Sequence, residues 1–148
     1  MSIRFASHND VDAIKALVTS LSRFYLKEQE SRLPAWFLES LSTAAFLKRI
    51  NDSAYLNWVF EREGHVLAYL ALKDGRHLYH LFVAETHQGQ GIATMLWEHA
   101  LTQCTSASIT VRSSLFAVPV YKKLGFIENA PKGEKDGIEF QALEFFRK

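Results

Sequence analysis

Cysteine is almost absent from this sequence, since Cys104 is the single example among 148 residues. One cysteine cannot form a disulfide within the chain, and no group of cysteines and histidines has the spacing of a metal site. Cys104 also falls on an apolar stripe, where thiols are usually inert, so we do not expect it to act as a nucleophile. These absences favour a reducing compartment, for which the cytoplasm is the simplest expectation, and a site without metal.

Long apolar runs and runs of like charge are missing as well. Nowhere do about 18 apolar residues follow one another, and the N-terminal "MSIRFASHND" has no apolar core of signal-peptide length. Lys and Arg together number 17, against 16 Asp and Glu, and they form no cluster along the chain. We therefore expect neither a membrane nor a nucleic acid as partner, whereas a small ligand stays open.

What the chain does contain is the pattern of a globular domain. Hydrophobic residues make up 48% of the sequence and are spread evenly over a length that suits one domain, 1–148. The first third predicts a strand over 2–6 and a helix whose apolar residues run from Val11 to Leu21. Two short helices are expected next, one beginning near Pro34 and one capped by Ser42.

The middle of the chain predicts three strands joined by hairpins. Segments 54–63 and 65–73 are separated by a turn at Gly64, and an Asp-Gly turn in "KDGR" leads to the third strand, 77–83. The remaining pattern predicts, in order, a helix with apolar residues every four positions from Ile92, a strand over 106–114, a short helix within 115–126 and a last strand over 137–146. Together these elements predict a mixed α/β fold.

A glycine-containing stretch, "HQGQGIATML" (87–96), connects the third strand to the following helix. Glycine costs roughly 0.5 to 1 kcal/mol there relative to alanine, so Gly89 and Gly91 indicate a need for bare backbone. The first N–H groups of a helix lack internal partners and lie at the positive end of its dipole, so a pyrophosphate can bind there. A tight turn that needs positive φ explains the glycines equally well, and both interpretations stay open.

Two other kinds of phosphate-binding loop fit this stretch less well. A P-loop ends in Gly-Lys-Ser/Thr, which is missing here, and the dinucleotide signature G-x-G-x-x-G would place a third glycine where Thr94 stands. A nucleotide-binding fold also requires several β-α-β crossovers, whereas this loop follows strands joined by hairpins.

Two segments resemble one known family. Gln88–Ala93 fit the Q/R-x-x-G-x-G/A motif of the Gcn5-related N-acetyltransferase (GNAT) superfamily, and "VPVYKKLGF" (118–126) is similar to its Tyr-x-x-x-Gly-Phe segment. The two occur in the family's order and at its usual distance, and the similarity covers about residues 54–126 well. It implies a GNAT-like fold, with a central, mostly antiparallel sheet of about six to seven strands, about four flanking helices, and strands splayed at the cofactor slot.

The resemblance further implies acetyl-CoA as the cofactor. The strand before the loop would bind the pantetheine arm through its backbone, as an added strand would. The loop would hold the pyrophosphate, and a serine would replace the asparagine that family members often carry at the end of the strand at 108–112. Lys122 and Lys123 are candidates for the 3′-phosphate. The residues expected around the cofactor are Leu81, Phe82, Val83, Gln88, Gly89, Gln90, Gly91, Ile92, Ala93 and either Ser113 or Ser114.

Acetyl transfer from a thioester to an amine requires a proton for the leaving thiolate and a group that accepts one from the amine. By the resemblance, Tyr121 is the general acid, and a ring that merely packs in a helix is the alternative. Family members often place a glutamate on the central strand, but "HLYHLFV" has none. His80 is therefore a candidate base, with Glu61 or Glu63 acting through water as rivals.

His80 also has a purely structural interpretation. It alternates with Leu78 and Phe82, so it is expected on their face of the strand, as a histidine of the core.

The acceptor pocket, by the same resemblance, lies between the first helices and neighbouring loops. Phe24, Tyr25, Trp36 and Phe37 are candidates to line it, and Glu28, Glu30 or Glu39 to attract a cationic amine. A free amino acid, a polyamine, an antibiotic and a protein N-terminus are all compatible acceptors. The resemblance also makes a homodimer compatible with the sequence. The expected reaction is direct acetyl transfer to a primary amine without a covalent enzyme intermediate. The alternative is a noncatalytic module that binds or senses acyl-CoA.

Overall fold

The N-terminal part of the computed structural model, which describes residues 2–28 and 32–147, has one strand followed by helices. These elements are β1 (Ser2–Phe5), the 3-10 turn η1 (His8–Asp10), α1 (Val11–Leu21), the 3-10 turn η2 (Ser22–Tyr25), α2 (Ala35–Ser40) and α3 (Thr43–Asn51). The two short helices predicted near Pro34 and Ser42 are α2 and α3. Ser42 caps α3, because its Oγ accepts a hydrogen bond from Ala45 N at 3.1 Å.

Three hairpin strands follow, as the sequence predicts: β2 (Tyr55–Arg62), β3 (His65–Lys73) and β4 (His77–Val83). The turn between β3 and β4 has positive φ at both central residues, 54° at Asp74 and 65° at Gly75. This backbone matches the twist of the flanking strands, which is why an Asp-Gly pair favours such hairpins.

The C-terminal half consists of η3 (Glu85–His87), α4 (Ile92–Thr102), β5 (Ser108–Ser113), α5 (Val118–Lys123), β6 (Ile127–Glu128), β7 (Gly133–Lys135) and β8 (Ile138–Phe146). Within the described residues the strands form one eight-stranded sheet in the order β1-β2-β3-β4-β5-β8-β6, with β7 paired to β8. Its pairs are antiparallel except for β4 with β5. The predicted fold class is confirmed, and the strand count is higher than expected because the short β6 and β7 add to β8.

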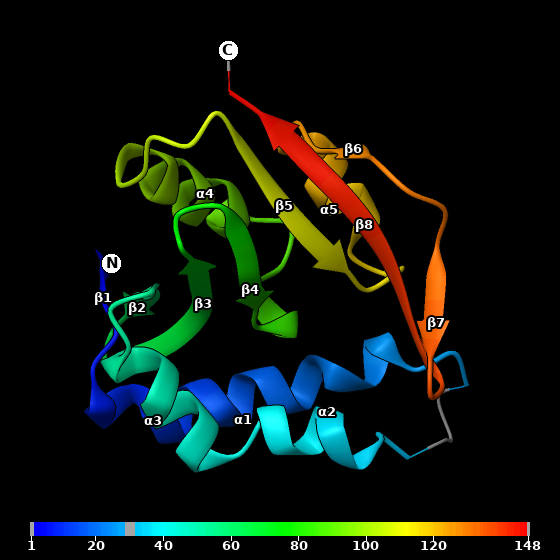
Figure 1. Cartoon of the computed structure of the whole chain (residues 1–148). Coiled ribbons are helices and arrows are strands. Elements are labelled where there is room, and N and C mark those ends of the chain that lie inside the picture. The colour runs from blue at the N-terminus through cyan, green and yellow to red at the C-terminus, as the bar shows by residue number, and fades with distance from the viewer. Residues whose placement is uncertain (1, 29–31, 148) are drawn as a thin grey trace.

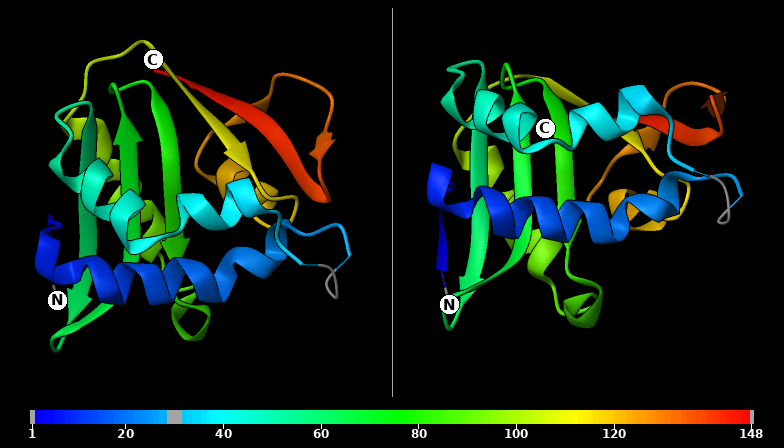
Figure 2. Two further views of the ribbon diagram at one scale, coloured as in Figure 1. Left: turned by 60° about the horizontal axis from the view of Figure 1, so that its bottom comes forward. Right: turned by 90° about the horizontal axis from the view of Figure 1, so that it is seen from below.

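Helices cover both faces of the sheet. On one face α1, α2 and α3 lie together (Figures 1 and 2), and Ile14 and Val18 of α1 pack with Val59 and Tyr69. On the other face α4 packs against the sheet through Ile92, Leu96 and Ala100, which belong to the same cluster as Leu70 and Leu72. None of the helices in the described part of the chain has the length and apolarity that a membrane crossing requires.

The sheet opens between β4 and β5. In the described chain these strands pair at two positions only, His77 with Thr110 and Leu78 with Val111, and beyond them they diverge (Figure 1). The expected splay is therefore present. It leaves the last residues of β4 without a neighbouring strand on the β5 side.

A β-bulge in β4 corrects the predicted position of His80. Leu78 pairs with Leu72 and His80 with Ala71, so Tyr79 is an extra residue on β4. The bulge turns His80 to the face opposite Leu78. Leu78 packs in the α4 cluster, whereas His80 packs with Phe82 on the α1 face.

Candidate functional site

Two cavities border the region where β4 and β5 separate. The first, which we call the loop cavity, has a volume of about 310 Å³ and is lined by η2, the end of β4, the loop from His87 to Thr94, and α5. The second, the aromatic cavity, has a volume of about 420 Å³ and is lined by α1, α2, β4, β5, β7 and β8. Tyr25 and Phe82 line both cavities, so the two meet at these side chains.

The glycines of the loop have the backbone that glycine alone adopts readily. Gly89 has φ 78° and Gly91 has φ 82°, and a Cβ built on either would meet no described atom within 4 Å. Positive φ thus explains the glycines, while the open space above them leaves room for a ligand to approach. Gly91 is the N-cap of α4, and in the described chain no side chain caps the first turn. The first N–H groups of α4 are therefore available to an anion.

The end of β4 offers backbone groups to the same cavity. Ala84 N donates to Leu67 O at 2.8 Å, toward β3. Hydrogen bonds alternate along an antiparallel ladder, so the backbone N–H and C=O groups of Phe82 also point toward β3. The backbone groups of Leu81 and Val83 point away from β3. The pairing of β5 ends before them, so their backbone groups face the gap. One of these groups already has a partner, because Gln88 Nε2 donates a hydrogen bond to Val83 O at 3.1 Å.

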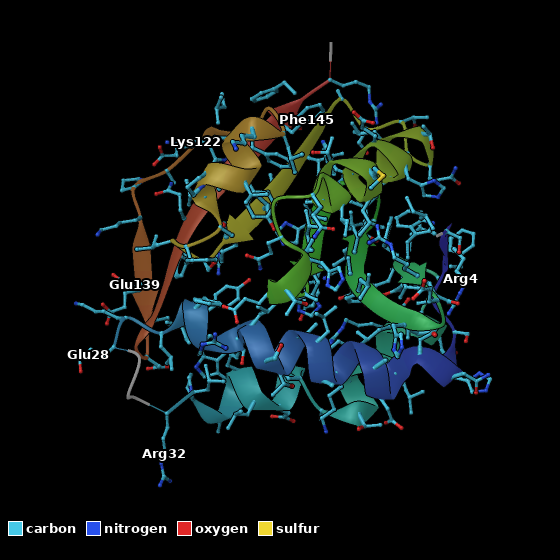
Figure 3. The ribbon with its side chains drawn as sticks, turned by 180° about the vertical axis from the view of Figure 1, so that it is seen from behind. Arg4, Glu28, Arg32, Lys122, Glu139 and Phe145 are labelled. Atoms are coloured by element: carbon cyan, nitrogen blue, oxygen red, sulfur yellow. The ribbon has the colours of Figure 1, made fainter. Side chains whose placement is uncertain are left out.

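The structure brings the predicted cofactor residues together. All of them line the loop cavity except Gln90, which is exposed, and Ser113, which is buried. Ser114 caps the turn before α5, since its Oγ accepts a hydrogen bond from Ala117 N at 3.2 Å. Lys123 lines the cavity, whereas Lys122 forms an ion pair with Glu128 at 2.8 Å on the outer surface (Figure 3).

Tyr121 of α5 is buried, with 6% of its surface exposed, and lines the loop cavity. Its ring packs edge-on against Phe126, with 5.5 Å between centroids. Burial raises the pKa of Tyr121 well above its usual value, so the hydroxyl holds its proton at neutral pH. Among the described residues no group forms a hydrogen bond with this hydroxyl, which leaves it able to donate to a ligand in the cavity.

The aromatic cavity contains the predicted acceptor residues Tyr25, Trp36 and Phe37. Phe24 lies elsewhere, in the loop cavity, where it stacks on Phe116 with 4.2 Å between ring centroids.

Two of the three expected carboxylates, Glu28 and Glu39, are not among the described lining residues of the acceptor site. Glu28 and Glu39 are exposed side chains outside the described lining of either cavity, and Glu30 lies outside the described residues. Neither Glu28 nor Glu39 contacts a ligand in these cavities as part of the described lining, and whether they attract a cationic amine from the surface stays a prediction.

His80 lines the aromatic cavity, in contact with the rings of Phe46, Tyr79 and Phe82. Within the described chain its Nδ1 is buried without a hydrogen-bond partner. Burial, reinforced by the charge of Arg49, lowers the pKa of His80 well below its usual value. The ring is neutral at pH 7, but it accepts a proton less readily than an exposed histidine does.

The rival bases lie far from the site. Glu61 accepts a hydrogen bond from Arg4 Nε at 2.7 Å, and Arg4 is at the edge of the molecule opposite Lys122 and Glu139 (Figure 3). Neither Glu61 nor Glu63 belongs to the described lining of the two cavities. A water-mediated role for either is not supported.

The lowered pKa of His80 predicts a loss of stability in mild acid. Below about pH 6.5 the unfolded chain protonates this histidine and the folded chain does not, so the free energy of unfolding falls as the pH decreases, by at most about 1.4 kcal/mol per pH unit. Urea unfolding at pH 7.5, 6.5 and 5.5 measures this slope. His80→Phe should make the slope of unfolding free energy against pH shallower. Part of the slope should remain because burial also lowers the pKa of His77. Equal slopes for both proteins would contradict the assignment.

Sequence reasoning missed several residues of the aromatic cavity, among them Arg112, Lys135 and Phe140. One signal for Arg112 was available, because alternation in "SITVRS" places it on the face opposite the buried Ile109 and Val111.

Several solved structures share the fold of this chain. The structure is similar to that of the PaiA N-acetyltransferase of Thermoplasma acidophilum in complex with coenzyme A, with a TM-score of 0.81, 17% identity, and 99% of this chain and 98% of that chain covered. It is also similar to a mutant of the spermidine N-acetyltransferase SpeG of Vibrio cholerae (TM-score 0.66, 19% identity, 99% and 95% covered). A ribosomal-protein-alanine N-acetyltransferase of Brucella melitensis gives a TM-score of 0.68 at 19% identity, with 99% and 100% covered.

At these identities the structural similarity shows a shared fold. No curated protein matches the chain by sequence. Residues 23–145, however, match the model of the family described as the acetyltransferase (GNAT) domain. The resemblance seen in the glycine loop and around Tyr121 is thus confirmed, and the chain belongs to the GNAT family of acetyl-CoA-dependent N-acetyltransferases.

Proposed function

We propose that the protein transfers an acetyl group from acetyl-CoA directly to a primary amine of a small molecule or peptide. The observation that carries the proposal is the junction of the two cavities at Tyr25 and Phe82, beside the gap between β4 and β5. Groups bound in the loop cavity and in the aromatic cavity come together there. Proximity of this kind is a large part of the catalysis of group transfer between two bound molecules.

The residues around the loop cavity have separate tasks in this proposal. Acetyl-CoA supplies the acetyl thioester. The backbone N–H groups of the loop from Gly89 to Ala93, at the start of α4, bind its diphosphate, and the backbone of Leu81 and Val83 binds the pantetheine arm. A backbone N–H of β4 donates a hydrogen bond to the carbonyl oxygen, where negative charge develops.

Tyr121 holds the proton that the leaving sulfur requires. An unperturbed tyrosine has a pKa of about 10 and a free cysteine thiol about 8.5, so full proton transfer to a thiolate is uphill by about 2 kcal/mol in water. Burial raises the pKa of Tyr121 further. The same apolar cavity would also desolvate the thiolate and raise its pKa, so Tyr121 Oη donates a hydrogen bond to the sulfur as charge develops there.

Direct attack by the amine is favoured over an acyl-enzyme. Cys104 lies outside the described lining of both cavities. Its carbonyl oxygen accepts a hydrogen bond from Arg147 Nη2 at 3.0 Å, behind α4. His80 is a candidate to accept the proton of the amine, since its neutral ring lines the acceptor side.

One observation favours the alternative, a module that binds acyl-CoA without catalysis. Among the described residues no aspartate or glutamate lines either cavity, and the lowered pKa of His80 makes it a weak base. Thiol release from acetyl-CoA with a panel of amino acids, polyamines and peptides separates the two. We expect CoA thiol to be released in the presence of one class of amine, and the amount of thiol to equal the amount of N-acetylated product. Binding of acetyl-CoA with no turnover on any class would support the module.

A further inference from the structure

The described lining of the aromatic cavity carries positive charge and no carboxylate. Arg112 is the first residue of β5 beyond the positions paired with β4, so it lies where the two strands part. Its guanidinium stacks on Phe140, with Cζ 4.5 Å from the ring centroid. No carboxylate in the described chain forms an ion pair with it. A guanidinium stacked in this way keeps its N–H groups available for another partner.

The other cation of the described lining, Lys135, lies beside an indole that also contacts a carboxylate. Lys135 Nζ lies 4.9 Å from the centroid of the Trp36 ring, and Trp36 Nε1 donates to Asp136 Oδ2 at 2.7 Å. The Lys135 ammonium and the Asp136 carboxylate thus both contact the indole of Trp36. The side chains of Lys135 and Asp136 are exposed. In the described chain Arg112 forms no ion pair, so its guanidinium is open to an acidic ligand.

A third cation stands behind the cavity wall. Arg49 of α3 is 7% exposed, its Nη2 donates to Ser40 O at 2.8 Å, and its Cζ lies 5.0 Å from the centroid of Tyr79. Ser40 and Tyr79 both line the cavity. Arg49 has no carboxylate partner among the described residues, and its charge is one cause of the lowered pKa of His80. A buried cation without a counter-ion makes the potential in the cavity more positive.

The histidines of the lining add no charge at neutral pH, because burial lowers the pKa of both His77 and His80. Most of the remaining lining is aromatic. Six of its rings are those of Tyr25, Trp36, Phe37, Tyr79, Phe82 and Phe140. A cavity of about 420 Å³ with such walls suits a ligand with an apolar body and a few polar groups.

We propose that the acceptor is an amine of amino-acid type, with a carboxylate that Arg112 binds and an apolar or aromatic body that lies among these rings. This inference rests on the proposed function, because it names the acceptor of the same site. A guanidinium matches a carboxylate with two parallel hydrogen bonds. A polyamine carries only positive charges, which would meet the charges of Arg112 and Arg49.

Matched pairs of amines that differ only in the carboxylate test the proposal: tryptophan with tryptamine, and tyrosine with tyramine. The dipeptide Trp-Gly separates a free amino acid from a peptide, and spermidine represents the polyamines. We expect kcat/KM to be at least about 10-fold higher for the carboxylated member of a pair. Arg112→Gln should remove this preference by raising KM for that member alone, and Arg112→Lys should restore part of it.

Arg76→Gln is the control, since it removes the same charge from a residue outside the described lining. A second readout does not depend on turnover: calorimetric binding of N-acetyltryptophan and N-acetyltryptamine in the presence of CoA. If no amine is acetylated but N-acetyltryptophan binds more tightly than N-acetyltryptamine, the proposed function fails, and Arg112 still binds a carboxylate in the aromatic cavity. A preference for tryptamine or spermidine, equal losses for both members of a pair in Arg112→Gln, or N-acetyltryptophan binding no more tightly would overturn the assignment.

Discussion

Tyr121→Phe is expected to lower kcat for acetyl transfer by about 10²- to 10⁴-fold, the usual contribution of a positioned general acid. The hydroxyl lines the loop cavity and, within the described chain, has no other hydrogen-bond partner, so its removal costs no internal contact. The ring keeps its contact with Phe126. Folding and acetyl-CoA affinity should therefore be nearly unchanged. Thiol release measures kcat, and the melting temperature with and without acetyl-CoA measures folding and affinity.

Tyr55→Phe is the matched control for this variant. Tyr55 lies on β2, outside the described lining of both cavities, and its ring contacts Tyr79 edge-on with 5.7 Å between centroids. It should retain full activity. Should Tyr121→Phe also retain it, the ring would only be packing in the core, and another group would have to protonate the sulfur.

Gly91→Ala is expected to abolish most of the stabilisation that acetyl-CoA gives to the folded protein. At a concentration 100 times its dissociation constant, a ligand stabilises by about 2.7 kcal/mol, and that shift should largely disappear. A Cβ at Gly91 would stand in the open space before the first turn of α4, where the diphosphate is proposed to bind, and φ 82° is strained for alanine. The ligand-free protein should lose about 1 to 2 kcal/mol from this strain alone.

Gly64→Ala separates the strain from the loss of binding. Gly64 has φ 77°, and a Cβ added there would meet no described atom within 4 Å, as at Gly91, but Gly64 lies in the turn between β2 and β3. The two variants should lose similar stability without ligand, and only Gly91→Ala should lose the acetyl-CoA shift. Equal acetyl-CoA shifts in both would mean that the glycine loop serves the turn alone.

Local signals explain how much of the fold could be predicted. The Asp74–Gly75 turn, the cap at Ser42 and the paired glycines before α4 each act within a few residues, and the structure contains all three. The short β6 and β7 have two and three residues and are defined by pairing with β8, which leaves almost no pattern in their own sequences.

The site was predictable on the cofactor side and poorly predictable on the acceptor side. The loop and β4 are continuous in sequence, so the residues from Leu81 to Ala93 could be assigned together. The side of the sheet on which His80 lies depends on the bulge at Tyr79, and nothing in the pattern of "HLYHLFV" predicts that bulge. The cationic side chains in the described lining of the aromatic cavity are Arg112 on β5 and Lys135 on β7, which the sheet brings together through β8.

Amide hydrogen exchange tests the central claim most directly, namely that the bare backbone at the start of α4 binds the diphosphate of acetyl-CoA. The amides from Gly89 to Thr94 can be followed with and without acetyl-CoA, with ATP and NAD as competing phosphate ligands. We expect acetyl-CoA to slow exchange at these amides by at least about 10-fold, and ATP and NAD to leave it unchanged. Protection elsewhere with none at these amides, or equal protection by ATP, would contradict it.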